Sequence, residues 1–218
     1  MTRQKAPEAC PGAALTRAFF ETGAAELVPR LLGKLLCHRT PEGLAAGMIV
    51  EAEAYCGPAD DAAHSFRGRR TARTEAMFGP AGRAYVFRIY GMHCCFNVVA
   101  AREGEPQAVL IRALEPVAGL ALMAARRGTE DPLQLCSGPG KLCRALDIGM
   151  AQYGLDLCGS ELFLANFRDF SPAEICVSPR VNVDYAEVWR DAPLRFFLKD
   201  SSYVSKVPRR YGALGTLG

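Results

Sequence analysis

The feature that most constrains the fold is a series of short apolar or alternating segments that are separated by tight-turn sequences. These strand-like segments cover residues 34–38, 44–55, 84–90, 93–100, 107–114, 161–165, 174–178 and 194–199. Helical spacing of apolar residues is confined to residues 24–32, residues 117–127 and a short segment that ends at Leu146. Few strands alternate with helices as they do in βαβ units, so the pattern predicts the α+β class with a mostly antiparallel sheet.

The composition is that of an ordinary globular protein. Half of the 218 residues are hydrophobic and 22% are charged, which excludes disorder, collagen and coiled coils. We expect one domain over residues 1–218. No segment approaches the roughly 18 apolar residues of a membrane span, and residues 1–11 carry charges and prolines where a signal peptide is apolar. The sequence therefore predicts a soluble, cytoplasmic protein without a membrane partner.

The cysteines bear on metals and on redox state. There are nine, at positions 10, 37, 56, 94, 95, 136, 143, 158 and 176. No two of them form a Cys-x-x-Cys pair and no His-x-x-x-His follows, so neither a structural zinc nor an iron–sulfur cluster is expected. We expect reduced, mostly buried thiols in a reducing compartment.

The segment Ile49 to Tyr55 carries two carboxylates with strand spacing. Glu51, Glu53 and Tyr55 project from one face, because strand side chains alternate. Such a pair is often a solubility device on an edge strand. Here the opposite face is small and apolar, which suggests that both faces are covered. In a partly dry site one carboxylate could then act as a general base.

A long segment without periodicity, residues 56–83, follows this strand. It contains His64, and beyond it five arginines, with Glu75 the one acid between Phe66 and Arg83. We call residues 66–83 the arginine loop. Guanidinium groups fit phosphate oxygens, so the loop could grip a nucleic-acid backbone; a merely solvated basic loop is an equal alternative.

The next segment, residues 85–97, has the pattern of an aromatic hairpin. Tyr85 and Phe87 share a strand face and could offer a stacking platform, and Tyr90 lies beside the turn. An aromatic side chain at a hairpin tip can wedge between bases. The alternative is a hairpin that packs into the core.

Together and in this order, these segments resemble the alkyladenine (3-methyladenine) DNA glycosylase family, also called the methylpurine-DNA glycosylase type. The matching motifs are Val50-Glu-Ala-Glu-Ala-Tyr55, Gly57-Pro58 through Ala62-Ala-His-Ser65, Met77-Phe78, Ile89-Tyr-Gly-Met92, Asn97, Leu110-Ile-Arg-Ala-Leu-Glu-Pro116 and Cys136-Ser-Gly-Pro-Gly-Lys-Leu-Cys143, with a weaker echo from Arg180-Val181 through Trp189 to Pro193-Leu-Arg-Phe196. The resemblance covers roughly residues 15–205. It implies one α+β domain with a curved, mostly antiparallel sheet, flanking helices and a protruding β-hairpin.

The resemblance also implies a monofunctional DNA glycosylase that begins base excision repair. Such an enzyme flips an alkylated or deaminated purine out of duplex DNA and hydrolyses the N-glycosidic bond. By position, Glu53 matches the general base that activates a water, and Arg112 and the carbonyl of Val181 match groups that hold this water. The mechanism requires neither a metal nor a cofactor.

Further residues match the pocket and the DNA-contacting surface of the family. Tyr55, His64 and Phe87 match the wall that stacks and hydrogen-bonds the flipped base, and Asn97 matches a residue that opposes the amino group of normal guanine. The hairpin tip, Tyr90 with Met92, matches the element that intercalates. Contacts to the DNA backbone are expected from Arg67, Arg69, Arg70, Arg73 and Lys141.

Two positions depart from the family pattern. Phe87 stands where some members carry Tyr, and His93 where another aromatic residue is usual. Both leave open whether neutral lesions such as hypoxanthine are substrates.

Two alternative functions rest on the same residues. Glu51, Glu53, Asp60 and Asp61 could bind Mg²⁺ in a nuclease, because clustered carboxylates are ligands for hard metal ions. The second alternative function is a DNA-binding module without catalytic activity. The glycosylase is the leading hypothesis, with damaged double-stranded DNA as partner, a monomer as the expected state, and a bacterial-type cytoplasm at the nucleoid, or the nucleus of a eukaryote, as location.

Overall fold

The computed structural model describes residues 10–208 and 211–214. Nine strands form one sheet with the order β3-β4-β5-β2-β8-β7-β9, and β1 pairs with both β2 and β6. The strands are β1 (Leu35–Thr40), β2 (Gly43–Tyr55), β3 (Ala84–Ile89), β4 (His93–Ala100), β5 (Gln107–Ala118), β6 (Leu162–Ala165), β7 (Ile175–Ser178), β8 (Arg195–Leu198) and β9 (Gly212–Ala213). Every strand pair among the described residues is antiparallel, so the predicted α+β class is confirmed.

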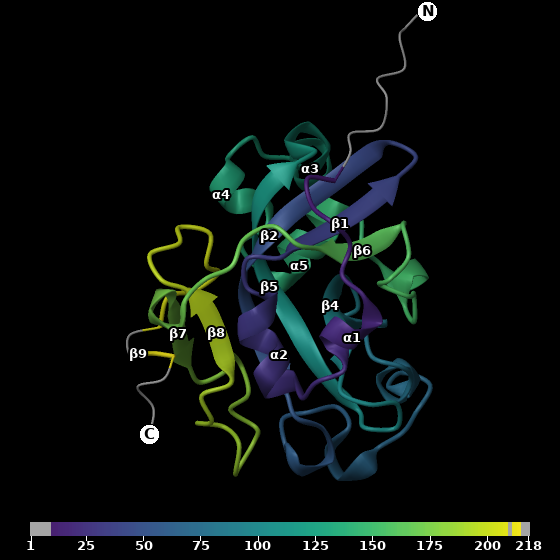
Figure 1. Cartoon of the computed structure of the whole chain (residues 1–218), viewed down its shortest axis with the longest axis vertical. Helices are drawn as coiled ribbons and strands as arrows, with labels where there is room; N and C mark the ends of the chain where they lie inside the picture. The colour runs from purple at the N-terminus through teal and green to yellow at the C-terminus, as the bar shows by residue number, and fades with distance from the viewer. Residues whose placement is uncertain (1–9, 209–210, 215–218) are drawn as a thin grey trace, which may run out of the picture.

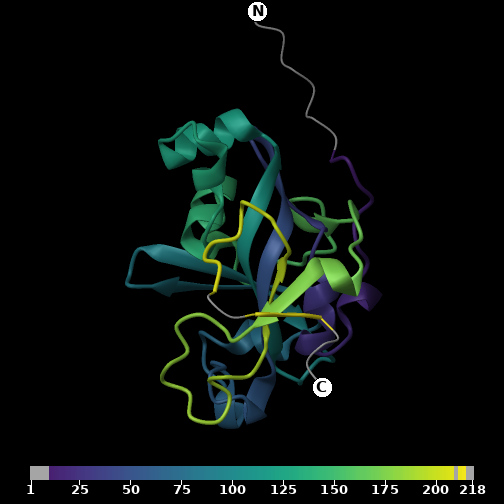
Figure 2. The same cartoon turned by 90° about the vertical axis from the view of Figure 1, so that its left-hand side faces the viewer.

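Short helices cover both faces of the long strands. They are α1 (Arg17–Phe20), α2 (Ala24–Leu31), α3 (Leu120–Arg127), α4 (Pro132–Leu135) and α5 (Pro139–Leu146). Figure 1 shows α2 in front of the sheet, and Figure 2 shows α3, α4 and α5 on the opposite side. The β3–β4 hairpin projects on that same side, away from α1 and α2. The expected protruding hairpin is therefore present.

Apolar side chains at helical spacing fix α2 and α5 on the sheet. In α2, Leu27, Val28 and Leu31 are fully buried, and in α5 the buried side chains include Leu142 and Leu146. Burying a side chain of this size stabilises the fold by roughly 1.5–3 kcal/mol. These contacts form a core on both sides of β2 and β5, which keeps the strands that carry the site residues rigid.

One helix begins later than the sequence suggests. A helix was expected over 117–127, but β5 continues to Ala118 and α3 begins at Leu120. Pro116 is tolerated in this strand because β4 pairs only with residues 107–110, and the register with β2 shifts beside Gly47. The expected helix therefore begins three residues later than predicted, because residues 117 and 118 still belong to the strand.

The segment that lacked periodicity forms no long helix or strand. Its regular parts are three single 3₁₀ turns, η1 (Gly57–Ala59), η2 (Phe66–Gly68) and η3 (Glu75–Phe78). The buried hydroxyl of Ser65 donates to the carbonyl of Pro106 at 2.8 Å, which ties the segment to the turn before β5. This loop lies beside the sheet and forms one wall of the cavity described below.

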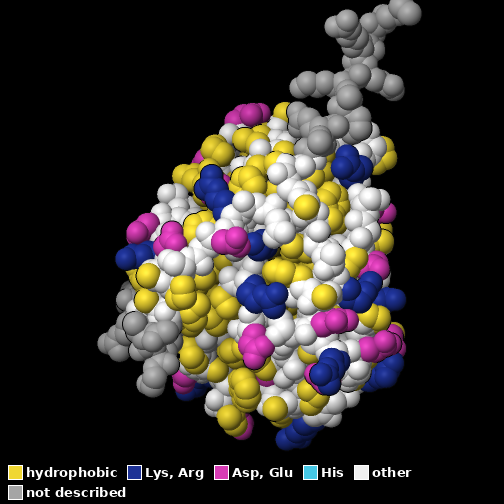
Figure 3. Space-filling model, viewed as in Figure 1, with side chains coloured by type: hydrophobic (Ala, Val, Ile, Leu, Met, Phe, Trp, Pro, Cys, Tyr) yellow, Lys and Arg dark blue, Asp and Glu magenta, His cyan; other side chains and the backbone are white. Residues whose placement is uncertain are grey.

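The surface over α1 and α2 carries both signs of charge. In Figure 3 the Lys and Arg side chains of this face lie among Asp and Glu side chains and apolar patches. Within residues 10–208 and 211–214, no helix has the length and apolarity that crossing a membrane requires. All nine cysteines lie in the described part of the chain and are free thiols, five of them buried.

Candidate active site

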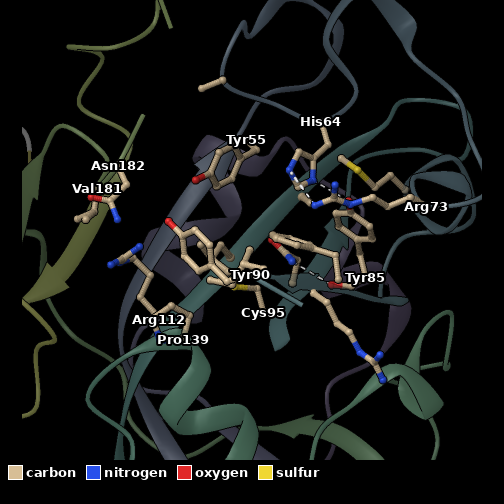
Figure 4. Close-up of a pocket in the computed structure, with 18 of the residues that line it drawn as sticks. Tyr55, His64, Arg73, Tyr85, Tyr90, Cys95, Arg112, Pro139, Val181 and Asn182 are labelled. Carbon is tan, nitrogen blue, oxygen red and sulfur yellow. Dashed lines mark hydrogen bonds between the residues drawn. The ribbon is translucent and has the colours of Figure 1, made fainter. Parts of the chain in front are cut away.

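A cavity of about 560 Å³ opens between the β3–β4 hairpin, β2, β5 and the segment after β7. The expected site residues Tyr55, His64, Phe87, Asn97 and Val181 all line it, together with Arg112, Tyr90 and Arg73. Figure 4 shows Val181, Asn182 and Arg112 at one end, His64, Tyr85 and Arg73 at the other, and Tyr55 between them. Segments that are far apart in the sequence therefore meet in one cavity.

The two carboxylates of β2 are both fully buried. Val50, Ala52 and Ala54 belong to the hydrophobic core, so the alternation of the strand turns Glu51 and Glu53 to the other face. That face is covered as well, as the small apolar residues suggested. The carboxylates are thus part of a desolvated site and not a solubility device.

Glu53 accepts hydrogen bonds from three elements. The amide N–H of Val181 donates to its Oε1 at 2.7 Å, and the hydroxyl of Tyr55 donates to its Oε2 at 3.1 Å. The Nη1 of Arg112 lies 3.4 Å from the carboxylate. The family resemblance pointed to the carbonyl of Val181, whereas the contact with Glu53 in this structure is made by its amide.

Glu53 lies immediately behind the cavity wall. It is not among the described residues that line the cavity, but Tyr55, Arg112 and Val181, its three partners, all do. A water that reaches Glu53 would therefore have to pass between these side chains.

A double irregularity in the β2–β5 ladder aims Arg112 at the carboxylates. Glu51 pairs with Ala113 and Ala52 with Ile111, so Arg112 has no partner on β2 and is the extra residue of a bulge. Bulges often redirect a side chain next to an active site. The Nε of Arg112 donates to Glu51 at 2.8 Å, so one guanidinium joins both carboxylates.

The other end of the cavity is aromatic. The rings of His64 and Phe87 meet edge to face with centroids 4.6 Å apart, and His64 Nδ1 lies 2.7 Å from the hydroxyl of Tyr85. Burial, followed by the charges of Arg73 and Arg69, lowers the pKa of His64 to about 4. At neutral pH the imidazole is therefore uncharged and offers one donor and one acceptor.

The ring of Tyr55 packs against the guanidinium of a buried ion pair, Arg180 with Asp60. The guanidinium of Arg180 lies 4.7 Å from the centroid of the Tyr55 ring and donates to both oxygens of Asp60 at 2.6 and 2.8 Å. Both charged side chains are buried. Arg180 was not predicted as part of the site, although it lies next to Val181 in a matching motif.

Asn97 is held in place by its neighbouring strand. It pairs with Tyr85 in the β3–β4 ladder, and its Nδ2 donates to the backbone carbonyl of Tyr85 at 2.9 Å. One N–H and the amide oxygen remain for a ligand in the cavity.

The hairpin tip is exposed and strained. Tyr90 and Met92 are 88% and 75% exposed. Tyr90 has a φ of 50° and Gly91 one of 72°, the pattern of a type I′ turn, in which Asn or Gly is the usual residue. A tyrosine in this conformation costs about 1–2 kcal/mol, so Tyr90 destabilises the turn relative to Asn or Gly.

The basic residues are distributed unequally around the site. Arg73 lies at the cavity, 5.0 Å from the Phe87 ring centroid, whereas Arg70 makes a two-bond ion pair with Glu75 at 2.9 and 2.6 Å. Arg67 and Arg69 are exposed. Lys141, at the start of α5, borders a second hollow that it shares with Tyr90 and Met92.

The carboxylates of the nuclease alternative are bound by arginine side chains or backbone amides. Glu51 faces two arginines, Asp60 pairs with Arg180, and Asp61 accepts the amide N–H groups of residues 187, 188 and 189 at 2.7, 2.8 and 3.0 Å. Across the described part of the chain, no three His, Cys, Asp or Glu side chains gather as metal ligands would. These carboxylates bind protein groups and are not arranged around a common point as the ligands of a metal ion would be.

Comparisons with known proteins place most of the chain in one family. The family model described as methylpurine-DNA glycosylase matches residues 18–202. A protein of Methanoculleus marisnigri, named as a candidate 3-methyladenine DNA glycosylase, is 52% identical over 195 residues, which is 88% of this chain and 98% of that protein. Proteins with the same name from Desulfitobacterium hafniense and Bacillus subtilis are 48% and 45% identical, over 88% and 94% of this chain and 98% and 100% of their own lengths. The chain belongs to the methylpurine-DNA glycosylase family.

Proposed function

We propose that the protein removes alkylated or deaminated purines of the 3-methyladenine type from duplex DNA by hydrolysing their N-glycosidic bond. The observation that carries this proposal is the buried Glu53 carboxylate behind the wall of an aromatic cavity, beside an exposed tyrosine at a hairpin tip. A base inside a duplex cannot reach a cavity of this kind, so the damaged nucleotide must flip out of the helix.

Glu53 has the position and the surroundings of a general base. It would take a proton from a water that attacks C1′ of the sugar while the purine leaves. Its negative charge would also stabilise the positive charge that develops on the sugar. Arg112 would orient Glu53 and the water from the side of β5, and Val181 from the opposite side.

The cavity wall suits an alkylated purine. Such a base carries a positive charge, which favours stacking against electron-rich rings such as those of Tyr55 and Phe87. His64 could hydrogen-bond the base without adding a charge, and Asn97 could exclude the exocyclic amino group of normal guanine. Tyr90 would occupy the gap that the flipped nucleotide leaves.

The test of this proposal is single-turnover base release in EDTA from duplexes that contain 7-methylguanine, 3-methyladenine or hypoxanthine. The native protein should release at least one of these bases at a rate that EDTA does not change, because carboxylate-activated water needs no metal. Glu53→Gln should slow release by about 10²- to 10⁴-fold, as loss of a general base does.

The matched control is Glu130→Gln, which removes an exposed carboxylate from the loop before α4. It should release bases at the native rate. Strand cleavage that requires added Mg²⁺, or base release that Glu53→Gln leaves intact, would show that the proposed chemistry is wrong.

A further inference from the structure

Glu51 is a carboxylate with three hydrogen-bond donors, although the proposed reaction gives it no role. It is fully buried and accepts hydrogen bonds from Arg112 Nε at 2.8 Å, from Arg195 Nε at 2.8 Å and from the amide of Ser205 at 2.7 Å. Burial raises its pKa, but the two guanidiniums and the Ser205 amide outweigh this effect and hold the pKa below its usual value. Glu51 is therefore negatively charged at neutral pH.

Arg195 has an unexpected direction. In the β2–β8 ladder it lies opposite Glu53, so a direct ion pair with that carboxylate would be the shortest connection. Its Nε instead donates to Glu51, one position away on the same face, and its Nη2 donates to the carbonyl of Lys206. Arg195 is 1% exposed, so packing on all sides fixes this direction.

The consequence is that Arg112 meets Glu53 with only one end of its guanidinium. Its Nε is occupied by Glu51, and the contact of its Nη1 with Glu53 is long, at 3.4 Å. An arginine that is free to turn prefers a two-bond pair with a carboxylate, and such a pair would occupy the oxygens that a water must reach. The four side chains carry two positive and two negative charges, so removing one of them leaves an uncompensated charge in the site.

We propose that Glu51 and Arg195 are positioning residues that hold Arg112 by its Nε, so that Arg112 orients Glu53 without closing on it. This inference rests on the proposed function. Neither residue would touch the DNA, so their contribution is to the rate of base release and not to the binding of lesion DNA.

The first test separates rate from binding. Glu51→Gln should lower the single-turnover rate of base release by about 10- to 100-fold, the effect of a small misplacement of reacting groups. The dissociation constant for a lesion duplex, measured by fluorescence anisotropy, should stay within about twofold of native. Arg195→Lys keeps the positive charge but cannot donate to Glu51 and to the carbonyl of Lys206 from separate nitrogens of one planar group. It should also lower the rate of base release and leave the dissociation constant near its native value.

A double-mutant cycle with Arg112→Gln then asks whether Glu51 acts through Arg112. If it does, Glu51→Gln should have almost no further effect on the rate in the Arg112→Gln background. If Glu51 has only a structural role, the fold-losses in rate caused by Glu51→Gln and by Arg112→Gln should multiply in the double variant. An unchanged rate in Glu51→Gln, or multiplying losses, would overturn the proposal.

Two controls keep the outcomes distinct. If the native protein releases no base, or if Glu53→Gln is fully active, the proposed function fails before Glu51 is considered. If Glu53→Gln is inactive and Glu51→Gln is native-like, the positioning role alone fails. Circular dichroism should show native folding in both Glu51→Gln and Arg195→Lys; if neither folds, the pair holds the sheet and not the site, and the inference is wrong.

Discussion

His64 illustrates how the cavity controls the charge of a single side chain. Its pKa falls from 6.5 to about 4, first because it is buried and then because Arg73 and Arg69 are near. A neutral ring avoids repulsion with a cationic base, which a protonated imidazole would cause. Burial is the larger of these causes, so the uncharged state of His64 at neutral pH follows mainly from its place in the cavity wall.

The same shift predicts how stability depends on pH. Between pH 6.5 and about 4 the unfolded chain binds a proton at His64 that the folded chain does not, so His64 destabilises the fold as the pH falls. We expect the difference in unfolding free energy between native protein and His64→Gln to change by about 2–3 kcal/mol between pH 7.5 and 4.5. Urea unfolding at both pH values measures it.

His93→Gln is the control for this experiment, because His93 is exposed on β4. Its unfolding free energy should follow the native protein across the same pH range. A native-like pH dependence in His64→Gln would show that the cavity does not suppress the protonation of His64.

The sequence predicts those site residues whose pattern lies within one short segment, and it does not predict contacts between distant segments. The alternation of β2 gave the shared face of Glu51, Glu53 and Tyr55 from the sequence alone. The contact between Asp60 and Arg180 could not be found in this way, since 120 residues separate the two side chains. Arg195 lies in the weakest of the matching motifs, but its hydrogen bond to Glu51 depends on the register between β8 and β2.

At the scale of elements, the β3–β4 hairpin combines strain with exposure. Tyr90 has the φ of a left-handed residue, and its ring is 88% exposed. Such strain usually persists only where function requires the residue. The turn therefore exposes the Tyr90 ring to solvent, and its strained backbone lowers the free energy of unfolding.

Two substitutions at Tyr90 should separate stability from function. Tyr90→Asn, which favours this backbone conformation, should raise the unfolding free energy by about 1 kcal/mol, measured by urea unfolding. Tyr90→Ala should bring no such gain, because alanine prefers other backbone conformations. Both variants should weaken binding to a lesion duplex more than they slow excision from single strands.

The comparison between substrates decides the role of the ring. Equal losses on duplex and single-stranded DNA would refute a wedge at the hairpin tip. A loss of stability in Tyr90→Asn would show that the turn is not strained.

The element boundaries show where sequence patterns are insufficient. The strands around the hairpin were predictable, because a tight turn separates two alternating segments. The bulge at Arg112 was not, since a register shift arises from the pairing of two strands and leaves no mark on either one. The direction of Arg112 is therefore a property of the sheet and not of its sequence motif.

At the scale of the whole molecule, the protein has a net charge of only +3, so binding to DNA depends on where the positive groups lie. Lys141 borders the same hollow as Tyr90 and Met92, and its ammonium group donates to Gln134 at 2.8 Å. This position would place it beside a duplex that the hairpin tip enters.

Lys141→Gln should therefore weaken binding to lesion and undamaged duplexes alike. The slope of log K against log salt should become less steep by about one, because one fewer counterion is released. Fluorescence anisotropy at four or more salt concentrations measures the slope. Lys199→Gln, which changes an exposed lysine at the end of β8, should keep the native slope; an equal change in both variants would contradict a specific role of Lys141.

The distribution of the site along the chain has a consequence during synthesis. Val181, Arg195 and Ser205, which donate to Glu53 or Glu51, follow these carboxylates by 128 to 154 residues. A chain that is still attached to the ribosome before residue 181 has two carboxylates in β2 but lacks these three donors. The complete set of donors around the two carboxylates is therefore assembled only after residue 205 has been synthesised, so the order of synthesis delays the finished site until long after β2 itself is made.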